Sequence, residues 1–495
     1  MSSDLVIVYH RQPYEEVEED GETVLRENKS PNGIVPTLKS FFGKVDHGAW
    51  VAWKLAEDAH TPGWERQIDI EDSFGRYTVS RLPLTQKQVH EFYHVTSKEA
   101  FWPILHSFKD RYNYDPVDWP NFREVNWRFA EAAAAEAAEG ALVWVHDYNL
   151  WLVPGYLRQM RPDVKIAFFH HTPFPAPDMF NVLPWRREIV ESLMACDSVG
   201  FHIPRYATNF AAVVQSLMDV EIIKREKVPD ELVADGTALT ERQVPAVLRG
   251  AHGDVVLSVS PVGVDVGYIQ KRARDESTQQ SAAEILHDLG DRRLILSVGR
   301  TDYTKGGIEQ LQSFERSLET RPELRGTVQL MHVSVSANRG MAAYGEIQSA
   351  IEEAVGRING RFGSLDWQPV TLVSRAIPFE DLIAYYRAAS VAWITPLADG
   401  MNLVAKEFIA SRVDGDGVLV LSEFAGAAVE LEAAVVTNPF SNRSMDAAIC
   451  QALDMSEPER RDRMKSMQRA VRQYDLSSWG HSIENLLPNH RKSAA

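Results

Sequence analysis

Short segments rich in Val, Ile and Leu alternate with longer segments of helical pattern along most of the chain. The apolar segments predict strands at residues 5–9, 141–145, 165–169, 198–201, 293–298, 328–335, 370–374, 391–395, 418–422 and 434–437. The alanine-rich range 126–139 predicts a helix that Gly140 ends as a C-cap. Apolar strands that alternate with helices are typical of parallel sheets covered on both faces, so the pattern predicts an α/β protein.

The strands fall into two series, which predict two doubly wound, Rossmann-like domains facing each other across a cleft. We place an N-terminal domain at residues 1–260, a C-terminal domain at 261–475, and a tail at 476–495 that packs back on the N-terminal domain. The polar range 230–253 has no clear assignment. Ligands of such sheets bind beyond the carboxyl ends of the strands, so functional residues are expected just after strands.

The composition is that of a folded, acidic protein. Hydrophobic residues make up 44% of the chain and charged residues 24%, which are near the averages for globular proteins. The 69 acidic residues outnumber the 52 Lys and Arg residues, and a net charge of −17 repels nucleic acid and anionic lipid. We therefore expect neither a nucleic-acid nor a membrane partner, and any cations that bind anionic substrates must be gathered inside a cleft.

The two cysteines indicate a reducing compartment. Cys196 and Cys450 lie far apart and lack the spacing of a metal or redox motif. The first residues carry an acid where a secretion signal needs a base, and no apolar stretch reaches the about 18 to 20 residues of a membrane span. We expect a soluble, cytoplasmic protein.

Several common catalytic motifs are absent from the sequence. There is no G-x-G-x-x-G after a strand and no G-x-x-x-x-G-K-[ST] loop, which disfavours dehydrogenases and kinases. No H-E-x-x-H, paired C-x-x-C or G-x-S-x-G motif occurs, which disfavours zinc hydrolases and serine esterases. The chemistry must therefore lie in other residues that follow strands.

A cationic turn follows the strand predicted at 293–298. Arg300 precedes the sequence Asp-Tyr-Thr-Lys-Gly-Gly at 302–307, which contains Lys305 and leads into a helix. Two cations beside the free amides of a helix N-terminus form a clamp suited to a pyrophosphate. A surface turn with solvated cations is the alternative that spacing alone leaves open.

A second loop, Thr-Pro-Leu-Ala-Asp-Gly at 395–400, ends another predicted strand. The range 401–407 predicts the first turns of a helix whose free amides can meet phosphate. Asp399 precedes this helix and is a candidate for its cap. Glu407 is placed to accept hydrogen bonds from a sugar diol, although an exposed helical glutamate is the simpler interpretation.

In the first half of the chain, polar residues follow two apolar strands. The sequences Trp-Val-His-Asp-Tyr-Asn at 144–149 and Phe-Phe-His-His-Thr-Pro-Phe-Pro at 168–175 both begin in a strand and end in a polar segment. A histidine in such a place is more often structural than catalytic. Two neighbouring strands that end in this way nevertheless favour a binding site.

Four of these motifs together resemble the trehalose-phosphate synthase family. They are His-Asp-Tyr at 146–148, His-Thr-Pro-Phe-Pro at 171–175, Asp-Tyr-Thr-Lys-Gly at 302–306 and Asp-Gly-Met-Asn-Leu-Val-Ala-Lys-Glu at 399–407. The resemblance spans nearly the whole chain and includes 355–360 and 422–426. It implies a GT-B fold and a retaining glycosyltransferase that needs no metal and no other cofactor.

The N-terminal half departs from the trehalose-phosphate pattern. Segments 9–16, 30–42 and 101–108 resemble the glucosylglycerol-phosphate synthases within the family. This implies ADP-glucose as donor and glycerol 3-phosphate as acceptor. A separate phosphatase would then release glucosylglycerol, a compatible solute of salt-stressed cells. A homo-oligomer is left open. Ala398 stands where relatives often carry arginine, which alters the charge beside Asp399.

The resemblance also implies roles for individual residues. The catalytic set, which acts on the leaving diphosphate and orients the glucose, comprises Arg300, Lys305, His171 and Asp399. The donor-binding set comprises Gly33, Ile377, Met401, Asn402, Leu403, Val404 and Glu407. The acceptor-binding set comprises Arg11, Tyr93, Trp102, Asp147 and Arg339, and no residue is assigned to a metal.

Three other functions are compatible with parts of the sequence. A catalytically inactive sugar-phosphate sensor could keep the fold but would not require Arg300, Lys305, Asp399 and Glu407 together. A GT-B phosphorylase would need a phosphate or cofactor site in place of the nucleotide contacts, which a measurement of ADP binding would reveal. Within the family, a trehalose-6-phosphate synthase that uses UDP-glucose and glucose 6-phosphate is the nearest alternative.

We predict that chelation of divalent ions does not abolish glucosyl transfer. No Asp-x-Asp motif follows a strand at the predicted cleft, and cationic side chains can neutralise the diphosphate in place of a metal ion. The initial rate with and without EDTA tests this. A loss of activity in EDTA that a divalent ion restores would contradict it.

Overall fold

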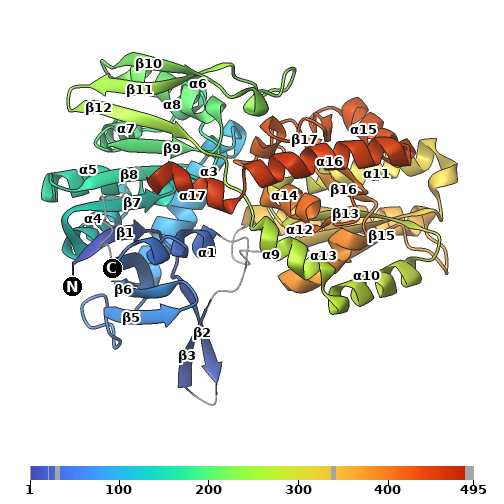
Figure 1. Cartoon of the computed structure of the whole chain (residues 1–495), viewed down its shortest axis with the longest axis horizontal. Helices are drawn as coiled ribbons and strands as arrows, with labels where there is room; N and C mark the ends of the chain where they lie inside the picture. The colour runs from blue at the N-terminus through green and yellow to red at the C-terminus, as the bar shows by residue number, and fades with distance from the viewer. Residues whose placement is uncertain (1, 20–21, 28–33, 336–341, 485–495) are drawn as a thin grey trace, which may run out of the picture. The chain divides into compact units, whose positions relative to one another are not determined.

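The computed structural model describes residues 2–19, 22–27, 34–335 and 342–484 and divides into two compact units (Figure 1). Unit 1 comprises Met1–Val228, Glu241–Pro261 and Trp479–Ala495, and unit 2 comprises Pro229–Thr240 and Val262–Ser478. The chain therefore passes into unit 2 after Pro261, one residue beyond the N-terminal domain expected at 1–260, and returns to unit 1 at Trp479.

Unit 1 is built on a large mixed sheet. In spatial order its described strands are β10 (Glu221–Lys227), β11 (Gln243–Gly250), β12 (Gly253–Val259), β9 (Ser198–Phe201), β8 (Lys165–His170), β7 (Ala137–His146), β1 (Ser3–Val8), β4 (Gly48–Leu55), β6 (Gly75–Leu84) and β5 (Gln67–Asp72). The strands from β12 to β6 pair in parallel, whereas β10, β11 and β5 add antiparallel pairs at the two edges. A separate hairpin joins β2 (Tyr14–Glu19) to β3 (Glu22–Glu27).

Helices cover the sheet of unit 1. They are α1 (Ile34–Lys39), η1 (Phe42–Lys44), α2 (Gln86–Val89), η2 (His90–Phe101), α3 (Trp102–Leu105), η3 (Lys109–Arg111), α4 (Trp119–Glu136), η4 (Tyr148–Leu150), α5 (Val153–Met160), α6 (Pro177–Phe180), α7 (Arg186–Leu193) and α8 (Pro204–Leu217). Helix α4 packs on β1, β4 and β6, while α8 packs on β9, β11 and β12. The central strands β1, β8 and β9 are consequently buried along almost their whole length.

The predicted C-cap at Gly140 is wrong. Helix α4 already ends at Glu136, and Ala137 begins β7. Gly140 has a φ of 70° and lies where the pairing of β7 with β1 shifts register. A glycine with positive φ suits a bulge inside a strand as well as a helix end, and the sequence alone does not distinguish the two.

Unit 2 has a parallel sheet. In spatial order its described strands are β15 (Val370–Val373), β14 (Val328–Val335), β13 (Arg293–Arg300), β16 (Val391–Ile394), β17 (Val418–Ser422) and β18 (Val435–Thr437). Every pair in this list is parallel. The two predicted doubly wound α/β domains are therefore confirmed.

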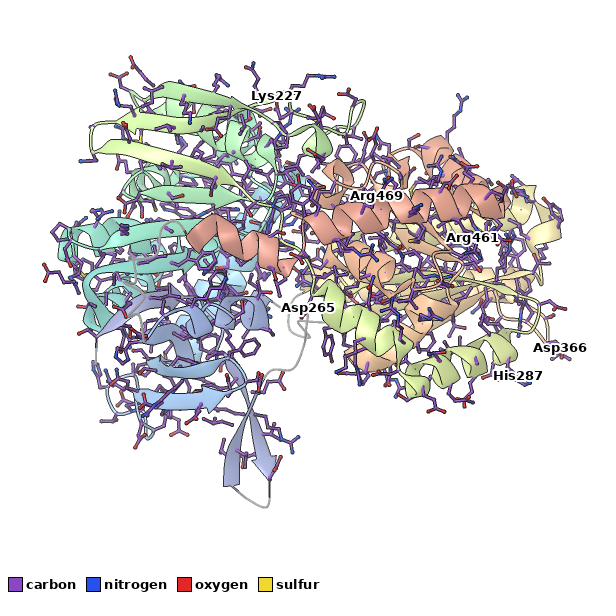
Figure 2. All side chains as sticks on the ribbon, in the orientation of Figure 1. Lys227, Asp265, His287, Asp366, Arg461 and Arg469 are labelled. Carbon is purple, nitrogen blue, oxygen red and sulfur yellow. The ribbon has the colours of Figure 1, made fainter. Side chains whose placement is uncertain are left out.

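Helices lie on both faces of this sheet. They are η5 (Asp230–Leu232), α9 (Val266–Arg274), α10 (Glu276–Leu289), η6 (Tyr303–Lys305), α11 (Gly307–Thr320), η7 (Pro322–Leu324), α12 (Ala342–Phe362), α13 (Phe379–Ala388), α14 (Leu403–Ser411), η8 (Gly426–Val429), α15 (Asn442–Asp454) and α16 (Glu457–Gln473). Helix α11 packs with α12 and α15, and Phe314, Ile358 and Ile449 of these helices share a core with Trp393 of β16. Helix α14 packs with α9, α13 and α16. The exposed side of α16 carries charged side chains such as Arg461 and Arg469 (Figure 2).

A buried ion pair holds the start of unit 2 against α14. The Lys406 Nζ donates to both carboxylate oxygens of Glu430 at 2.9 Å and to the Val262 carbonyl at 2.8 Å, and both charged side chains are fully buried. A Cβ on Gly263 would lie 2.2 Å from the Tyr474 carbonyl oxygen, so the backbone segments at these two residues of unit 2 lie in direct contact. Removal of either charge would leave the other buried without a partner, which is strongly destabilising.

Trp479 on α17 (Leu476–Glu484) belongs to the core of unit 1. Its side chain is only 1% exposed, and its ring stacks on Trp144 with a centroid distance of 5.2 Å. Phe41 and Phe169 contact its ring edge-on, at centroid distances of 6.1 and 5.2 Å. Trp479 therefore completes an aromatic cluster whose three members named here, Phe41, Trp144 and Phe169, lie in the first 170 residues.

Of the strands that the apolar pattern does not predict, β4 is central and largely buried, whereas most of the others are half-exposed or polar. Strand β5 alternates exposed and half-buried positions, and β10 is exposed along most of its length. The unassigned range 230–253 contains η5 and the whole of β11. Such edge strands depend on pairing with distant neighbours and lack the continuous apolar run that marks a central strand.

Among the residues that the structure describes, no helix combines the length and the apolar character needed to cross a membrane.

We predict that Trp479→Ala destabilises unit 1 by about 3 to 5 kcal/mol, the usual cost of truncating a buried tryptophan to alanine. Thermal unfolding followed by calorimetry would measure the loss. Trp127→Ala is the matched control because Trp127, on α4 in the same unit, is 40% exposed. A loss no larger than that of the control would contradict the assigned role of Trp479.

Candidate active site

The pocket of unit 2 lies where its strand order reverses. Numbered along the chain from β13, the sheet order is 3-2-1-4-5-6, and the neighbours β13 and β16 lie at the switch point. The helix that follows β13 is α11, which packs with α12 and α15, whereas the helix that follows β16 is α14, which packs with α9 and α13. Connections that leave toward opposite faces open a crevice at the strand ends, where ligands of such sheets bind.

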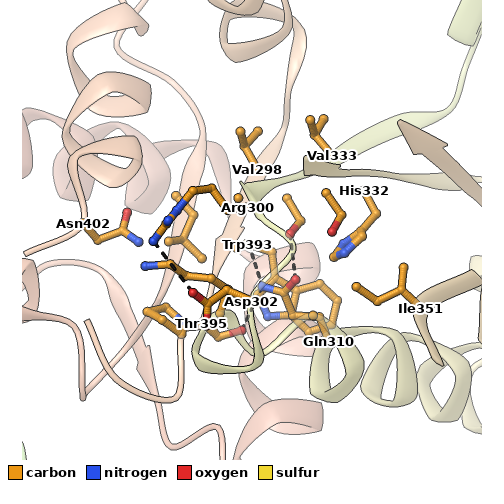
Figure 3. A pocket seen from close by; sticks show the side chains of 17 residues that line it. Val298, Arg300, Asp302, Gln310, His332, Val333, Ile351, Trp393, Thr395 and Asn402 are labelled. Carbon is orange, nitrogen blue, oxygen red and sulfur yellow. Dashed lines mark hydrogen bonds and ion pairs between the residues drawn. The ribbon is translucent and has the colours of Figure 1, made fainter. Parts of the chain in front are cut away.

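Figure 3 shows this pocket from close by. Its lining includes Ser297, Gly299, Arg300, Asp302, Lys305, Gly307, Gln310, His332, Ser334, Trp393, Thr395, Pro396 and Asn402. Arg300, Asp302 and Asn402 lie toward one side, and His332 and Ile351 lie toward the other (Figure 3). The cationic turn after β13 and the loop after β16, which the sequence analysis singled out, therefore meet in one pocket.

Lys305, Asp399 and Asn402 form a hydrogen-bonded group. The Lys305 Nζ donates to Asp399 Oδ2 at 2.6 Å, and the Asn402 Nδ2 donates to the same oxygen at 3.1 Å. The lysine and aspartate side chains are 20% and 16% exposed, so the pair borders the pocket without being sealed from water. An anion that approached Lys305 would compete with Asp399 for its charge.

Arg300 lies on the same side. One nitrogen of its guanidinium is 3.8 Å from Asp302 Oδ2, while Asp302 Oδ1 accepts hydrogen bonds from the amide and hydroxyl of Thr304. Gly306 has a φ of 69°, and a Cβ there would lie 2.2 Å from the Thr395 carbonyl oxygen. The glycine thus lets the turn after β13 lie directly against the loop after β16.

A buried glutamine fixes the two strands at the base of the pocket. Gln310 accepts from the Ser297 hydroxyl at 2.7 Å and donates to the Trp393 carbonyl at 2.9 Å and the Thr395 hydroxyl at 3.0 Å. Its oxygen and both amide protons are engaged, which joins β13, α11 and β16 in one geometry.

The predicted cap of α14 is corrected by the structure. The helix begins at Leu403, two residues after the expected start, and the Asn402 side chain accepts from the Ala405 amide at 3.1 Å. Asn402, with a φ of 86°, is therefore the N-cap, and Asp399 instead pairs with Lys305. Leu403 and Val404 occupy the first turn, where amides have no intrahelical acceptor and can meet an anion.

Two further donor-binding candidates lie on or just before α14. Met401 is 3% exposed in the loop before the helix. Glu407 is 7% exposed, so it is not the exposed helical glutamate of the simpler interpretation, and its Oε2 accepts from the Tyr386 hydroxyl at 2.8 Å. The hydrogen bond fixes the rotamer of the carboxylate.

The remaining candidates of the donor half lie elsewhere. Ile377 lies between β15 and α13 and lines a separate hollow of unit 2 with Glu284, Ile285 and Tyr385. Gly33, a donor-binding candidate, and Arg339, an acceptor-binding candidate, lie outside the described residues.

Unit 1 brings three candidates to one edge of its sheet. Strands β1, β7 and β8 are parallel neighbours, so their carboxyl ends lie together. Arg11 follows β1, Asp147 follows β7, and His171 follows β8. The predicted clustering of polar residues after neighbouring strands is therefore present within this unit.

The other two acceptor candidates lie on or beside η2, a π-helical segment. Its winding is shown by the Trp102 amide, which donates to the Ser97 carbonyl five residues earlier, and the hydroxyls of Thr96 and Ser97 also donate to carbonyls five residues earlier. Tyr93 lies within this segment and hydrogen-bonds the Arg11 guanidinium, while Trp102 follows it and is 6% exposed. Single π-helical turns within α-helices occur often at functional sites, although this segment is longer than most.

Asp147 is strained and has a perturbed pKa. Its backbone has a φ of 71° and a ψ of 162°, a region that residues other than glycine rarely occupy. Burial raises the pKa of its carboxyl to about 6, against the lowering effect of the Tyr148 and His171 amides and of the positive charge of Lys98 and Arg11. Its Oδ1 is buried and accepts no hydrogen bond from the described part of the chain. Strain and an unsatisfied carboxylate oxygen in one residue indicate a binding group.

The histidines after these strands are neutral. The His171 Nε2 lies 3.1 Å from the His146 Nδ1. Burial holds the pKa of both rings well below the usual value. Trp479 also lies beside the His171 ring, at a centroid distance of 6.2 Å. A neutral imidazole can orient a hydroxyl but carries no charge to stabilise an anion.

Three residues of the site, His10, Lys98 and Tyr386, were not among those predicted from the sequence. Tyr386 reaches Glu407 from α13, 21 residues away in sequence, and no motif marks that pairing. His10 directly precedes Arg11, and Lys98 lies between Tyr93 and Trp102. Their places in the sequence beside predicted acceptor-binding residues could have indicated them. Within the described ranges, no group of three or more His, Cys, Asp or Glu side chains is arranged to hold a metal ion.

Known proteins resemble this chain over almost its whole length. The family model described as glycosyltransferase family 20 matches residues 3–489. A glucosylglycerol-phosphate synthase from Synechocystis sp. is 52% identical over 98% of this chain and 97% of its own length. A trehalose-6-phosphate synthase from Mycolicibacterium gilvum is 38% identical over 98% of this chain and 93% of its own length.

A solved structure resembles the whole chain. It is an alpha,alpha-trehalose-phosphate synthase (UDP-forming) from Burkholderia vietnamiensis, with a TM-score of 0.82, 30% identity, and coverage of 98% of this chain and 99% of its own. The expected GT-B fold is thereby confirmed. The chain belongs to glycosyltransferase family 20 and is a glycosyltransferase.

Proposed function

We propose that this enzyme transfers glucose from ADP-glucose to glycerol 3-phosphate and forms glucosylglycerol phosphate and ADP. The observation that most supports this is the difference in identity between two relatives. The relative named glucosylglycerol-phosphate synthase is 52% identical, whereas the one named trehalose-6-phosphate synthase is 38% identical over a similar length. The departures in segments 9–16, 30–42 and 101–108 point the same way.

The donor diphosphate would bind at the switch point of unit 2. Arg300 and Lys305 line this pocket together with Asn402, and the next residues, Leu403 and Val404, carry first-turn amides that can meet the diphosphate. Glu407, held by Tyr386, would accept hydrogen bonds from the ribose hydroxyls. Ile377 would contact the base through its main chain. The diphosphate would replace Asp399 as the partner of Lys305 and free that carboxylate for the glucose hydroxyls.

The transfer would proceed with retention and without a protein nucleophile. The bond between the glucose C1 and the diphosphate oxygen breaks, and negative charge develops on ADP while positive charge develops on the sugar. Cations fixed at the diphosphate stabilise this state more than the ground state. The leaving oxygen accepts the proton of the acceptor hydroxyl, whose oxygen forms the new bond to C1. Neutral His171 orients the glucose.

The proposal includes the metal requirement of the reaction, the fate of its product and the location of the enzyme. We propose that no metal ion is required, since Arg300 and Lys305 can neutralise the diphosphate. A separate phosphatase would release glucosylglycerol for protection against salt stress. A cytoplasmic location is supported by Cys196 and Cys450, which are both free thiols. Assembly into a homo-oligomer is left open.

The decisive experiment combines two donors with two acceptors. The protein is incubated with ADP-glucose or UDP-glucose and with glycerol 3-phosphate or glucose 6-phosphate, and the products are identified by mass spectrometry. We expect the fastest transfer from ADP-glucose to glycerol 3-phosphate. Faster transfer to glucose 6-phosphate at equal concentration would favour the trehalose-6-phosphate synthase alternative.

We predict that Arg300→Ala and Lys305→Ala each lower kcat by about 10² to 10³, or roughly 2.7 to 4 kcal/mol, by analogy with the loss of one oxyanion-site donor. Substrate affinity should fall less than turnover, because the charge on the diphosphate grows as the bond breaks. Lys271→Ala, on the exposed face of α9, is the control. If kcat stayed near normal while only KM for ADP-glucose rose, the two residues would be uniform binders.

We predict that Asp147→Asn removes one acidic limb of the pH profile. With a pKa of about 6, the carboxyl ionises as the pH rises through this value and can then accept a hydrogen bond from the acceptor. The ratio of wild-type to variant kcat/KM for the acceptor should therefore rise through pH 6, and this ratio cancels ionisation of the acceptor phosphate. A ratio independent of pH from 5 to 8 would refute the role.

The same variant has a predicted effect on stability. The pKa of Asp147 is raised above its ordinary value of 3.8, so its contribution to stability is complete below pH 3.8 and is lost as the pH rises through about 6. At pH 8 the free energy of unfolding of the variant should therefore be about 1 to 3 kcal/mol higher than that of the wild type. Equal stability at pH 8 would show that other contacts offset the burial.

A further inference from the structure

Lys98 lies between the two aromatic candidates of the acceptor half. Its Nζ is 4.0 Å from the centroid of the Trp102 ring and 5.6 Å from that of the Tyr93 ring. The residue is only 7% exposed. A lysine is rarely so buried unless its charge is compensated, and the two aromatic faces contribute to that compensation.

The π-helical winding of η2 accounts for this position. Tyr93 and Lys98 are five residues apart, the spacing of hydrogen-bonded positions in a π-helix, and the ammonium group lies over the Tyr93 ring. Trp102 follows four residues later, just beyond the end of η2. The local backbone therefore directs the ammonium group toward both acceptor candidates.

Lys98 and Arg11 act on the same neighbours. The positive charges of both residues lower the pKa of the Asp147 carboxyl and of the His10 ring, so both lie within electrostatic reach of these groups. Arg11 also hydrogen-bonds Tyr93, over whose ring the Lys98 ammonium lies. Two cations thus share a space with one strained carboxylate, inside a chain whose net charge is −17. An anion bound beside these groups would interact favourably with the positive charge of both residues.

His10 supplies an independent sign of a ligand. The residue is 6% exposed, and neither ring nitrogen has a hydrogen-bond partner among the residues that the structure describes. Its ring lies 5.5 Å from that of Tyr93, and burial holds its pKa well below the usual value, so the ring is neutral. Buried polar atoms without partners are costly, and a hydroxyl of a bound molecule would satisfy them.

We propose that Lys98 binds the phosphate of the acceptor together with Arg11, while His10 and Asp147 face its hydroxyls. The inference rests on the proposed function and adds a residue that determines the acceptor class, a small phosphorylated alcohol. Lysine suits the role because its compact ammonium group binds phosphate as a point charge.

The test compares three variants with the wild type. Lys98→Met removes the charge but keeps most of the side-chain length, and Lys98→Arg keeps the charge. Lys109→Met is the matched control, since Lys109 is exposed on η3 in the same unit. KM for glycerol 3-phosphate is measured at saturating ADP-glucose, and inorganic phosphate and ADP are measured as inhibitors of the same reaction.

We expect Lys98→Met to raise KM for glycerol 3-phosphate and the inhibition constant of inorganic phosphate by about 10- to 100-fold, the loss of one charge-assisted hydrogen bond. The inhibition constant of ADP should change less than twofold. Lys98→Arg should recover most of the affinity, and Lys109→Met should behave as the wild type. If Lys98→Met does not fold, Lys98→Gln takes its place.

Two outcomes would overturn the proposal. Unchanged constants for phosphate in Lys98→Met would show that Lys98 does not bind it. An equal loss for phosphate and ADP would show that Lys98 only supports the fold. If the wild type transfers glucose to glucose 6-phosphate instead, the proposed function fails, but inhibition by inorganic phosphate still decides the role of Lys98, because both acceptors carry a phosphate.

Discussion

The parallel direction of the central strands is the constraint on which both halves of the site depend. Parallel strands present all their carboxyl ends at one edge, so residues far apart in sequence converge without any direct signal between them. In unit 2 this places the turn after β13 against the loop after β16, and Lys305 meets Asp399 across 94 residues. In unit 1 the same rule gathers Arg11, Asp147 and His171.

The chemistry of the two halves differs in how charge is handled. In unit 2 the cations border an open pocket and are paired with carboxylates, so an incoming anion exchanges one partner for another at small cost in desolvation. In unit 1 the histidines are buried and neutral, and the carboxyl of Asp147 is partly protonated near pH 6. Unit 1 is therefore better suited to hydrogen bonding with hydroxyls, with Lys98 and Arg11 as local exceptions.

The sequence predicted those features that depend on local pattern. Strands β9, β14 and β17 have the predicted bounds, because strands buried on both faces are rich in apolar residues. The edge strands escaped prediction because their pairing partners, not their own side chains, hold them in place. Asp399 was predicted as the cap in place of Asn402 because both residue types are good caps, and only the turn geometry decides between them. The π-helical winding that places Lys98 has no known sequence signal.

The burial of Trp479 has a consequence for the order of folding during synthesis. Domains generally fold as they emerge, from the N-terminus onward. Trp144, Phe41 and Phe169 emerge early, yet the ring that covers them is translated only after nearly all of unit 2. While translation continues, unit 1 can form its sheet but must leave an aromatic surface open to water. Apolar surface exposed in this way during folding favours aggregation, and slower translation would prolong its exposure.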